Sequence, residues 1–217
     1  MPHMPHPPST RSLVPIPTDV SYYSLFDLTP PSPAADSAGG QSNQERIRRE
    51  LSALEGGGYV LDTRDLRSRF FKRQQGCHPD SYTGQGKVYE LALDQSSFIN
   101  KAYSALADPL SRAQYLLEIY GNPIGETDSL DDPALLMEVM EAREELEDAE
   151  TEEEVERVKV SNAEHIQTAM QGLARAFGSD PPDLGRAKSL AIEMQYLKNL
   201  ERAAREWQPG KRVQVVH

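Results

Sequence analysis

Apolar residues recur at intervals of three and four along most of the chain, and this spacing predicts an all-α protein. In the first half, two such stretches cover residues 62–77 and 88–106. Within the earlier stretch, Leu66 and Phe70 fall on one face, one turn apart. A short polar loop joins the two stretches, so we expect an antiparallel helical hairpin. A shorter helix is expected over residues 110–120.

Three longer helical patterns occupy the second half, over residues 133–149, 152–177 and 182–207. Each pattern has its own helix breaker. The middle pattern keeps its spacing for more than about six turns, and a helix of that length needs partners to be stable. We therefore expect a three-helix bundle in which the apolar residues of the middle helix face the other two helices. These residues are Val155, Val158, Ile166, Met170, Leu173 and Phe177.

The remaining segments are expected to be short elements and connections. Residues 22–28 are apolar and aromatic and predict a brief helix. This helix must end there, because Thr29, Pro30 and Pro31 follow it. Residues 31–58 are rich in Ser, Gly, Ala and charge, and we interpret them as an inserted surface loop with one helix at 44–54. The predicted order is a disordered tail (1–19), a first domain (20–121, with the insertion at 31–58), a linker (122–132), a three-helix domain (133–208) and a tail (209–217).

Composition excludes several classes of protein. The net charge of -11 argues against a general nucleic-acid binder, because contact with phosphates requires clustered Lys and Arg. The single cysteine excludes an internal disulfide framework and a cysteine-rich zinc module. No run of about 18 apolar residues is present, so no membrane-spanning helix is expected. We expect no bound metal or cofactor.

The tripeptide His78-Pro79-Asp80 lies in the loop between the first two long helical patterns. Proline disfavours the helical conformation at the residue before it, so the chain must turn there and expose polar side chains. The helix that leads into the loop is basic, and Arg69, Lys72 and Arg73 share one arc of it. The basic residues of this helix are Arg64, Arg67, Arg69, Lys72 and Arg73.

A second group of residues is not explained by core packing. On the helix from Pro133, Leu136, Met137 and Met140 lie roughly 90 to 200° from the centre of the core stripe, together with Glu144. On the last helix, Tyr196 lies about 100° from the inward face. This apolar surplus favours either a partner surface or packing against the first domain, and periodicity leaves both open. The core stripe itself comprises Leu135, Val139, Ala142 and Leu146.

Other chemistry-bearing residues favour structural roles. The acidic run at 138–156 is typical of a solvated helix face, because it lacks the glycine-punctuated oxygen ligands of a cation site. His165 is interpreted as a surface or helix-packing residue. An enzyme that uses Cys77, His78 and Asp80 is disfavoured, because adjacent side chains diverge around Pro79 and no further His or Cys lies nearby in the sequence.

The tripeptide, its polar loop and the long helix after it resemble the J domain, the DnaJ-type module that stimulates ATP hydrolysis by DnaK-class chaperones. Over residues 22–211, apart from the insertion, the chain resembles the HscB family of iron–sulfur J-protein co-chaperones, specifically its fungal mitochondrial members. The resemblance is carried by residues 22–26 (YYSLF), 61–63 (LDT), 78–80 (HPD), 100–103 (NKAY), 108–110 (DPL), 135–146 and 207–211 (WQPGK).

The resemblance implies two partners: a DnaK-class mitochondrial chaperone and the scaffold on which iron–sulfur clusters are built. The implied chaperone-binding residues are His78, Pro79 and Asp80 with Arg67, Arg69 and Lys72. The implied scaffold-binding residues are Leu136, Met137, Met140, Glu141, Glu144 and Tyr196. The resemblance also implies the mitochondrial matrix as the location. A mitochondrial import signal is typically rich in arginine, whereas Arg11 is the only positively charged residue before Asp19.

The implied activity is that of a co-chaperone and not of an enzyme. The sequence lacks a phosphate-cradling glycine loop and a paired nucleophile and base. The alternative is a helical adaptor without ATPase-stimulating activity, which would account for the bundle but not for the tripeptide.

Overall fold

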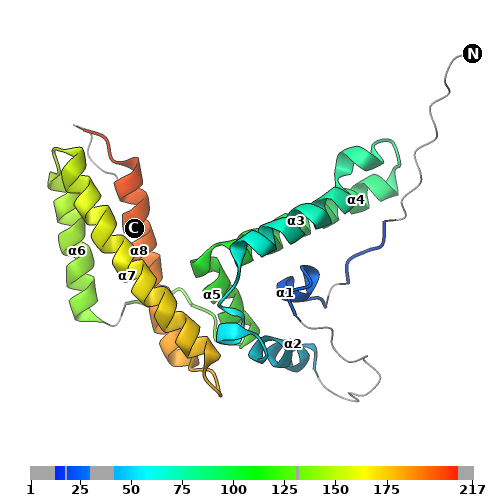
Figure 1. The fold of residues 1–217 in the computed structure, drawn as a ribbon, viewed down its shortest axis with the longest axis horizontal. Coiled ribbons are helices and arrows are strands. Elements are labelled where there is room, and N and C mark those ends of the chain that lie inside the picture. Colours follow the sequence, from blue (N-terminus) through cyan, green and yellow to red (C-terminus); the bar gives the residue numbers. More distant parts are fainter. Residues whose placement is uncertain (1–12, 18, 30–41, 131, 210–217) are drawn as a thin grey trace, which may run out of the picture. The chain divides into compact units, whose positions relative to one another are not determined.

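The computed structural model describes residues 13–17, 19–29, 42–130 and 132–209. These residues form helices without any strand, which confirms the predicted all-α class (Figure 1). The α-helices are α1 (Tyr22–Leu25), α2 (Asn43–Ser52), α3 (Thr63–Cys77), α4 (Lys87–Ala107), α5 (Pro109–Ile119), α6 (Pro133–Asp148), α7 (Glu152–Gly178) and α8 (Leu184–Glu206). Two short 3-10 helices are η2 (Glu55–Gly58) and η3 (Pro79–Tyr82).

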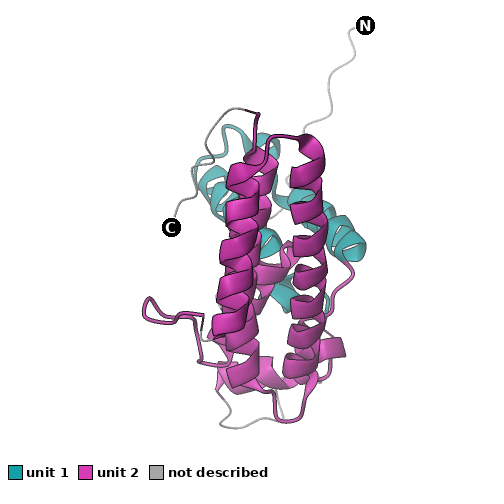
Figure 2. Ribbon diagram, turned by 90° about the vertical axis from the view of Figure 1, so that its left-hand side faces the viewer, with its two compact units in different colours: residues 1–28, 63–104 teal, residues 29–62, 105–217 magenta. Residues whose placement is uncertain are grey.

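The chain divides into two compact units, which are coloured separately in Figure 2. Unit 1 comprises residues 1–28 and 63–104, and unit 2 comprises residues 29–62 and 105–217. The expected first domain, 20–121, is therefore distributed over both units: its described residues 42–62 and 105–121 group with α6, α7 and α8. That the chain folds as independent domains with the predicted boundaries stays a prediction.

Unit 1 is built on the antiparallel hairpin of α3 and α4. The Phe70 ring of α3 stacks on the Tyr103 ring of α4 with 4.2 Å between the centroids. About one turn nearer the hairpin loop, Gln74 donates to the Asn100 side-chain oxygen at 2.8 Å and to the Ser96 carbonyl at 3.2 Å. The core of this unit is completed by α1, which contributes fully buried aromatic rings. The buried side chains include Tyr23, Phe26, Leu66, Ile99 and Ala102.

Unit 2 contains the expected bundle of α6, α7 and α8, which lie side by side in Figures 1 and 2. The start of α7 is fixed by a capping box, in which Thr151 and Glu154 satisfy each other's free backbone amides. Farther along, Asn162 of α7 donates to the Leu197 carbonyl of α8 at 2.9 Å. One end of the core consists of Leu146, Val155, Val158, Leu200, Ala203 and Ala204.

The described part of the insertion, residues 42–58, is more than a surface loop. Ile47 and Leu51, one turn apart on α2, are buried. Gly57 has a φ of 60°, and a Cβ there would collide with the carbonyl oxygen of Phe177 in α7. This close approach requires glycine. The interpretation of this part as a surface loop is therefore wrong, although its predicted helix at 44–54 is observed as α2; residues 31–41 lie outside the described residues.

The end of the expected N-terminal tail also has defined contacts. Gln95 of α4 donates a hydrogen bond to the Val14 carbonyl at 2.6 Å, so residues 13–17 lie against unit 1. They are not part of a contact-free tail. Residues 1–12 and 18 lie outside the described residues, as do residues 210–217 of the expected C-terminal tail.

Candidate functional site

The first candidate site is the turn formed by His78, Pro79 and Asp80. Helix α3 ends at Cys77, and His78 adopts an extended conformation, with φ −61° and ψ 125°. Pro79 then opens η3, where its missing amide costs no helical hydrogen bond. The side chain of His78 is 55% exposed and that of Asp80 is 90% exposed. The sequence-based prediction of an exposed polar turn is therefore confirmed.

The imidazole of His78 organises the turn. Its Nδ1 accepts a hydrogen bond from the Asp80 amide at 3.3 Å, which requires a lone pair on Nδ1 and places the ring proton on Nε2. The same Nδ1 lies 3.7 Å from the Asp80 carboxylate, a contact that becomes an ion pair only when the ring is protonated. The ring therefore orients the backbone of the turn, while the Asp80 carboxylate stays exposed.

Three further hydrogen bonds hold the turn in place. The buried Tyr82 donates its hydroxyl to the Gly76 carbonyl at 2.8 Å, which ties η3 back to the end of α3. The Ser81 amide donates to the His78 carbonyl at 3.0 Å, and the Thr83 hydroxyl donates to the Asp80 carbonyl at 3.1 Å. The exposed carboxylate of Asp80 is therefore presented by a turn whose backbone is fixed.

The basic residues of α3 are of two kinds. Arg69 turns toward the end of α1, where it pairs with Asp65 at 2.7 Å and donates to the carbonyls of Phe26 and Asp27 at 3.2 and 2.8 Å. Arg73 pairs with both carboxylate oxygens of Asp27 at 2.8 and 2.9 Å. In this way the two arginines hold α1 against the hairpin.

Arg67 and Lys72, in contrast, are exposed. The guanidinium of Arg67 lies 5.6 Å from the centroid of the Phe71 ring, a cation–π distance. Phe71 itself is 56% exposed, a large value for a phenylalanine in the middle of a helix. Of the three basic residues predicted to bind the chaperone, Arg67 and Lys72 are therefore exposed, and the exposed Phe71, which was not predicted, lies beside Arg67.

The second candidate site is the outer face of α6. Leu136, Met137 and Met140 are 38%, 64% and 53% exposed, whereas Val139 and Leu146 of the same helix are buried. The helical-wheel prediction that the first three lie outside the core is confirmed. Glu144 is exposed as well, and Tyr196 of α8 is half-buried. Their role in binding a partner stays a prediction.

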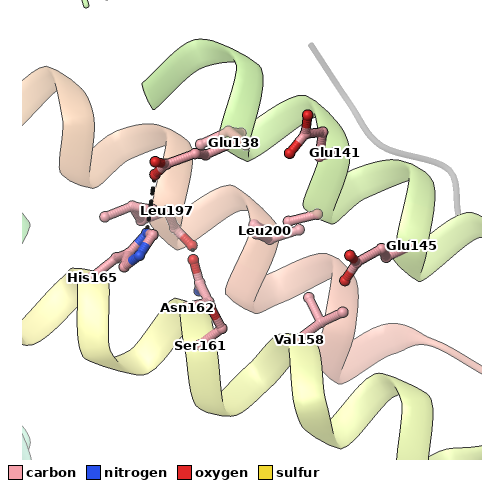
Figure 3. Close-up of a pocket in the computed structure, with 11 residues that line it drawn as sticks. Glu138, Glu141, Glu145, Val158, Ser161, Asn162, His165, Leu197 and Leu200 are labelled. Atoms are coloured by element: carbon pink, nitrogen blue, oxygen red, sulfur yellow. Dashed lines mark hydrogen bonds and ion pairs between the residues drawn. The ribbon is translucent and has the colours of Figure 1, made fainter. Parts of the chain in front are cut away.

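Glu141 belongs to a different flank of α6. Together with Glu138 and Glu145, it lines a groove of about 270 Å³ that also has walls from α7 and α8 (Figure 3). Across this groove, a Glu138 carboxylate oxygen lies 3.9 Å from Nδ1 of His165, which agrees with the helix-packing interpretation of that histidine. The six predicted scaffold-binding residues therefore do not all line one groove.

Comparisons with known proteins match the C-terminal bundle to a family model and most of the chain to relatives. Residues 131–205 match the family model described as the HSCB C-terminal oligomerisation domain. The chain is 31% identical to the mitochondrial J-type co-chaperone JAC1 of Saccharomyces cerevisiae over 165 residues, which cover 73% of this chain and 85% of that protein. The chain belongs to the HscB family.

Other relatives support the assignment to the HscB family. The HscB homologue of Aeromonas hydrophila is 35% identical over 67% of this chain and 89% of that protein, and the iron–sulfur cluster co-chaperone HscB of Homo sapiens is 32% identical over 66% of this chain and 61% of that protein. The crystal structure of human HscB matches with a TM-score of 0.71 at 25% identity and covers 94% of this chain and 93% of that chain. Yeast Jac1 matches with a TM-score of 0.62 at 25% identity, covering 88% of this chain and 98% of that chain.

Three other features of this HscB-family chain concern its cysteine, its potential metal ligands and the hydropathy of its helices. Burial raises the pKa of the Cys77 thiol, which disfavours the reactive thiolate beside the turn. Within the described ranges, no three His, Cys, Asp or Glu side chains are grouped so that they could hold a metal ion. None of the described helices is both long and apolar enough to cross a membrane.

Phe71 is an exposed apolar residue near the first candidate site that the sequence analysis did not single out. Leu66 and Phe70 were sufficient to define the buried face of α3, and a residue adjacent to Phe70 must lie about 100° away from that face. An apolar side chain at that position is the available signal, as it is for Met137 and Met140 on α6. The two faces therefore share one feature: large apolar side chains among charged neighbours on an exposed helix.

The contacts of Arg69 predict that its replacement by alanine destabilises the chain, whereas the same replacement of Lys72 does not. In Arg69→Ala, the Phe26 and Asp27 carbonyls and the Asp65 carboxylate lose their common donor, so α1 should detach more easily. We expect the free energy of unfolding to fall by about 1 to 2 kcal/mol. Lys72→Ala should change it by no more than about 0.5 kcal/mol. Urea unfolding followed by circular dichroism measures both, and equal losses in the two variants would refute the distinction.

Proposed function

We propose that the chain is a J-type co-chaperone that stimulates ATP hydrolysis by a DnaK-class chaperone and delivers the iron–sulfur cluster scaffold protein to it. The observation that carries this proposal is the fixed turn that presents the Asp80 carboxylate, 90% exposed, at the end of a cationic helix. Membership of the HscB family supports it, because relatives are named J-type and iron–sulfur cluster co-chaperones.

Docking on the chaperone is electrostatic. Arg67 and Lys72 are exposed on α3 and fit an acidic groove of the ATPase partner, while Arg69 keeps α1 in place beneath them. Charges of this kind accelerate encounter and fix orientation more than they add affinity. Once docked, His78, Pro79 and Asp80 contact the chaperone, and the Asp80 carboxylate disturbs the network that restrains its ATP hydrolysis.

Scaffold binding uses the outer face of α6. Exposed methionines and leucines surrounded by carboxylates form an adaptable apolar surface, for which Met is well suited because its side chain is flexible and polarisable. Leu136, Met137 and Met140 supply the apolar contacts, with Tyr196 of α8 as an aromatic anchor. Glu141 and Glu144 add charge, one on the groove side of α6 and one on its exposed surface.

The chain carries out no covalent chemistry in this proposal. ATP hydrolysis belongs to the chaperone, and the chain raises the effective concentration of the scaffold at the chaperone by holding both partners. The name of the yeast relative, which includes the word mitochondrial, supports the mitochondrial matrix as the location. No nucleic acid and no membrane takes part.

A single-turnover ATPase assay tests the proposal. The chain is added to a mitochondrial DnaK-class chaperone preloaded with ATP, and the hydrolysis rate should rise with the concentration of chain until it saturates. A helical adaptor would bind the scaffold but would leave the rate at its basal value. That result would refute the proposal and favour the adaptor.

Phe71 should contribute to chaperone docking. Its ring, 56% exposed, lies beside Arg67 and becomes buried when an acidic surface covers α3. Phe71→Ala should raise the concentration of chain needed for half-maximal stimulation about tenfold, since burial of a large apolar side chain contributes on the order of 1.5 kcal/mol or more. Leu93→Ala removes an apolar side chain of α4 that is 43% exposed and should have little effect. Equal shifts in both variants would exclude Phe71 from the interface.

A further inference from the structure

Residues 13–17 have a specific docking site on α4. The Val14 carbonyl accepts from Nε2 of Gln95 at 2.6 Å, and Gln95 is only 6% exposed although it lies in the middle of the helix. A buried side-chain amide without partners costs free energy, so the segment satisfies a group that the helix alone would leave unpaired. Gln95 therefore anchors the segment at one defined point.

The segment also lies along an apolar part of α4. Pro15, Ile16 and Pro17 line a crevice of about 220 Å³ together with Leu91 and Phe98. Ile16 is half-buried, whereas Val14, two residues before it, is 74% exposed. The two prolines restrict the backbone before it docks, which lowers the entropy lost on ordering the segment.

The same segment borders the cationic side of α3. Leu13, Val14 and Ile16 line a second cavity, of about 680 Å³, whose walls also include Arg69 and Lys72. An acidic side chain of a docking partner must come within about 4 Å of the Lys72 amine to form an ion pair. Lys72 is exposed, and the docked segment forms one wall of the cavity beside it, which narrows the approach of such a side chain from that direction.

We propose that residues 13–17 are an intramolecular cover, here called the strap, which competes with the acidic surface of the chaperone for the cationic side of α3. This inference rests on the proposed function. The strap reduces the fraction of chains that are open for docking, and the apparent dissociation constant rises by the inverse of that fraction. Release of the strap, with loss of the Gln95 hydrogen bond, removes this wall and widens the approach to Lys72.

Two variants release the strap in different ways. A chain lacking residues 1–17 removes it, and Gln95→Met in the full chain removes its donor while keeping the volume of the side chain. Both should lower the concentration of chain needed for half-maximal ATPase stimulation at least threefold, with an unchanged maximal rate. A chain lacking only residues 1–12 is the matched control and should behave as the full chain does. Unchanged or higher half-maximal concentrations in both releasing variants would overturn the proposal.

A measurement that requires no chaperone tests the strap independently of the proposed function. Amine acylation followed by mass spectrometry compares Lys72, which lines the cavity, with Lys101, an exposed lysine of α4 that does not line it. Removal of the strap should raise the ratio of the Lys72 rate to the Lys101 rate at least twofold. If the full chain fails to stimulate any ATPase, the proposed function fails, while this ratio still decides on the strap. An unchanged ratio would show that the strap covers nothing.

Discussion

Asp80→Ala should reduce stimulation of the chaperone ATPase to the basal rate while the chain remains folded. The carboxylate of Asp80 is 90% exposed, and Nδ1 of His78 lies 3.7 Å from it. The hydrogen bonds that fix the turn use the Asp80 amide and carbonyl, which alanine retains. The substitution therefore removes the group proposed to act on the partner and leaves the turn intact. Single-turnover hydrolysis measures the effect, and thermal unfolding should show a midpoint within a few degrees of the unmodified chain.

Glu90→Ala is the matched control for this experiment. Glu90 is an exposed carboxylate on α4 of the same unit, so its removal changes the net charge by the same amount. Stimulation by Glu90→Ala should equal that of the unmodified chain. Full stimulation by a folded Asp80→Ala chain would contradict the assignment of the turn as the activating element.

Replacing Leu136, Met140 and Tyr196 by alanine should abolish high-affinity scaffold binding. A buried anchor in a protein interface contributes about 2 kcal/mol, which corresponds to a roughly 30-fold change in dissociation constant for each residue. Leu136 and Met140 are 38% and 53% exposed, so their truncation leaves the helix core of Val139 and Leu146 in place. Calorimetry with purified scaffold measures the affinity of each single variant and of the triple variant.

Val160→Ala provides the control for the scaffold experiment. Val160 lies on α7 of the same bundle and is 53% exposed, the same fraction as Met140. Its substitution should leave scaffold affinity unchanged. The triple variant should still stimulate the chaperone ATPase in the absence of scaffold, because its substitutions all lie in unit 2. Unchanged scaffold affinity in the triple variant would remove α6 from the proposed interface.

The helices and the exposed turn could be predicted from the sequence because their signals are local. The proline after His78 forces the turn wherever the rest of the chain lies. Periodicity likewise identified the three long helices, with ends within a few residues of those observed. It also separated Leu136 and Met140 from the core of α6, since the angle around a helix depends only on sequence position.

Contacts between distant residues could not be predicted in this way. Arg69 was grouped with Lys72 by its position on the helix, but it donates to carbonyls 42 and 43 residues earlier in the chain. Gly57 belongs to the segment that was interpreted as a surface loop, yet a Cβ there would collide with Phe177 of α7. The strap depends on a bond between Val14 and Gln95, 81 residues apart. Residue type and spacing carry no information on such pairs.

A mixing experiment tests most directly whether one chain must hold both partners. Asp80→Ala retains the scaffold-binding face, and the Leu136, Met140 and Tyr196 triple variant retains the activating turn, so an equimolar mixture supplies both functions on separate molecules. At concentrations well below half-saturation, scaffold should enhance ATPase stimulation by the unmodified chain and should give no enhancement with the mixture, since effective concentration requires a covalent link. Equal scaffold-dependent stimulation by the mixture and by the unmodified chain would contradict this account.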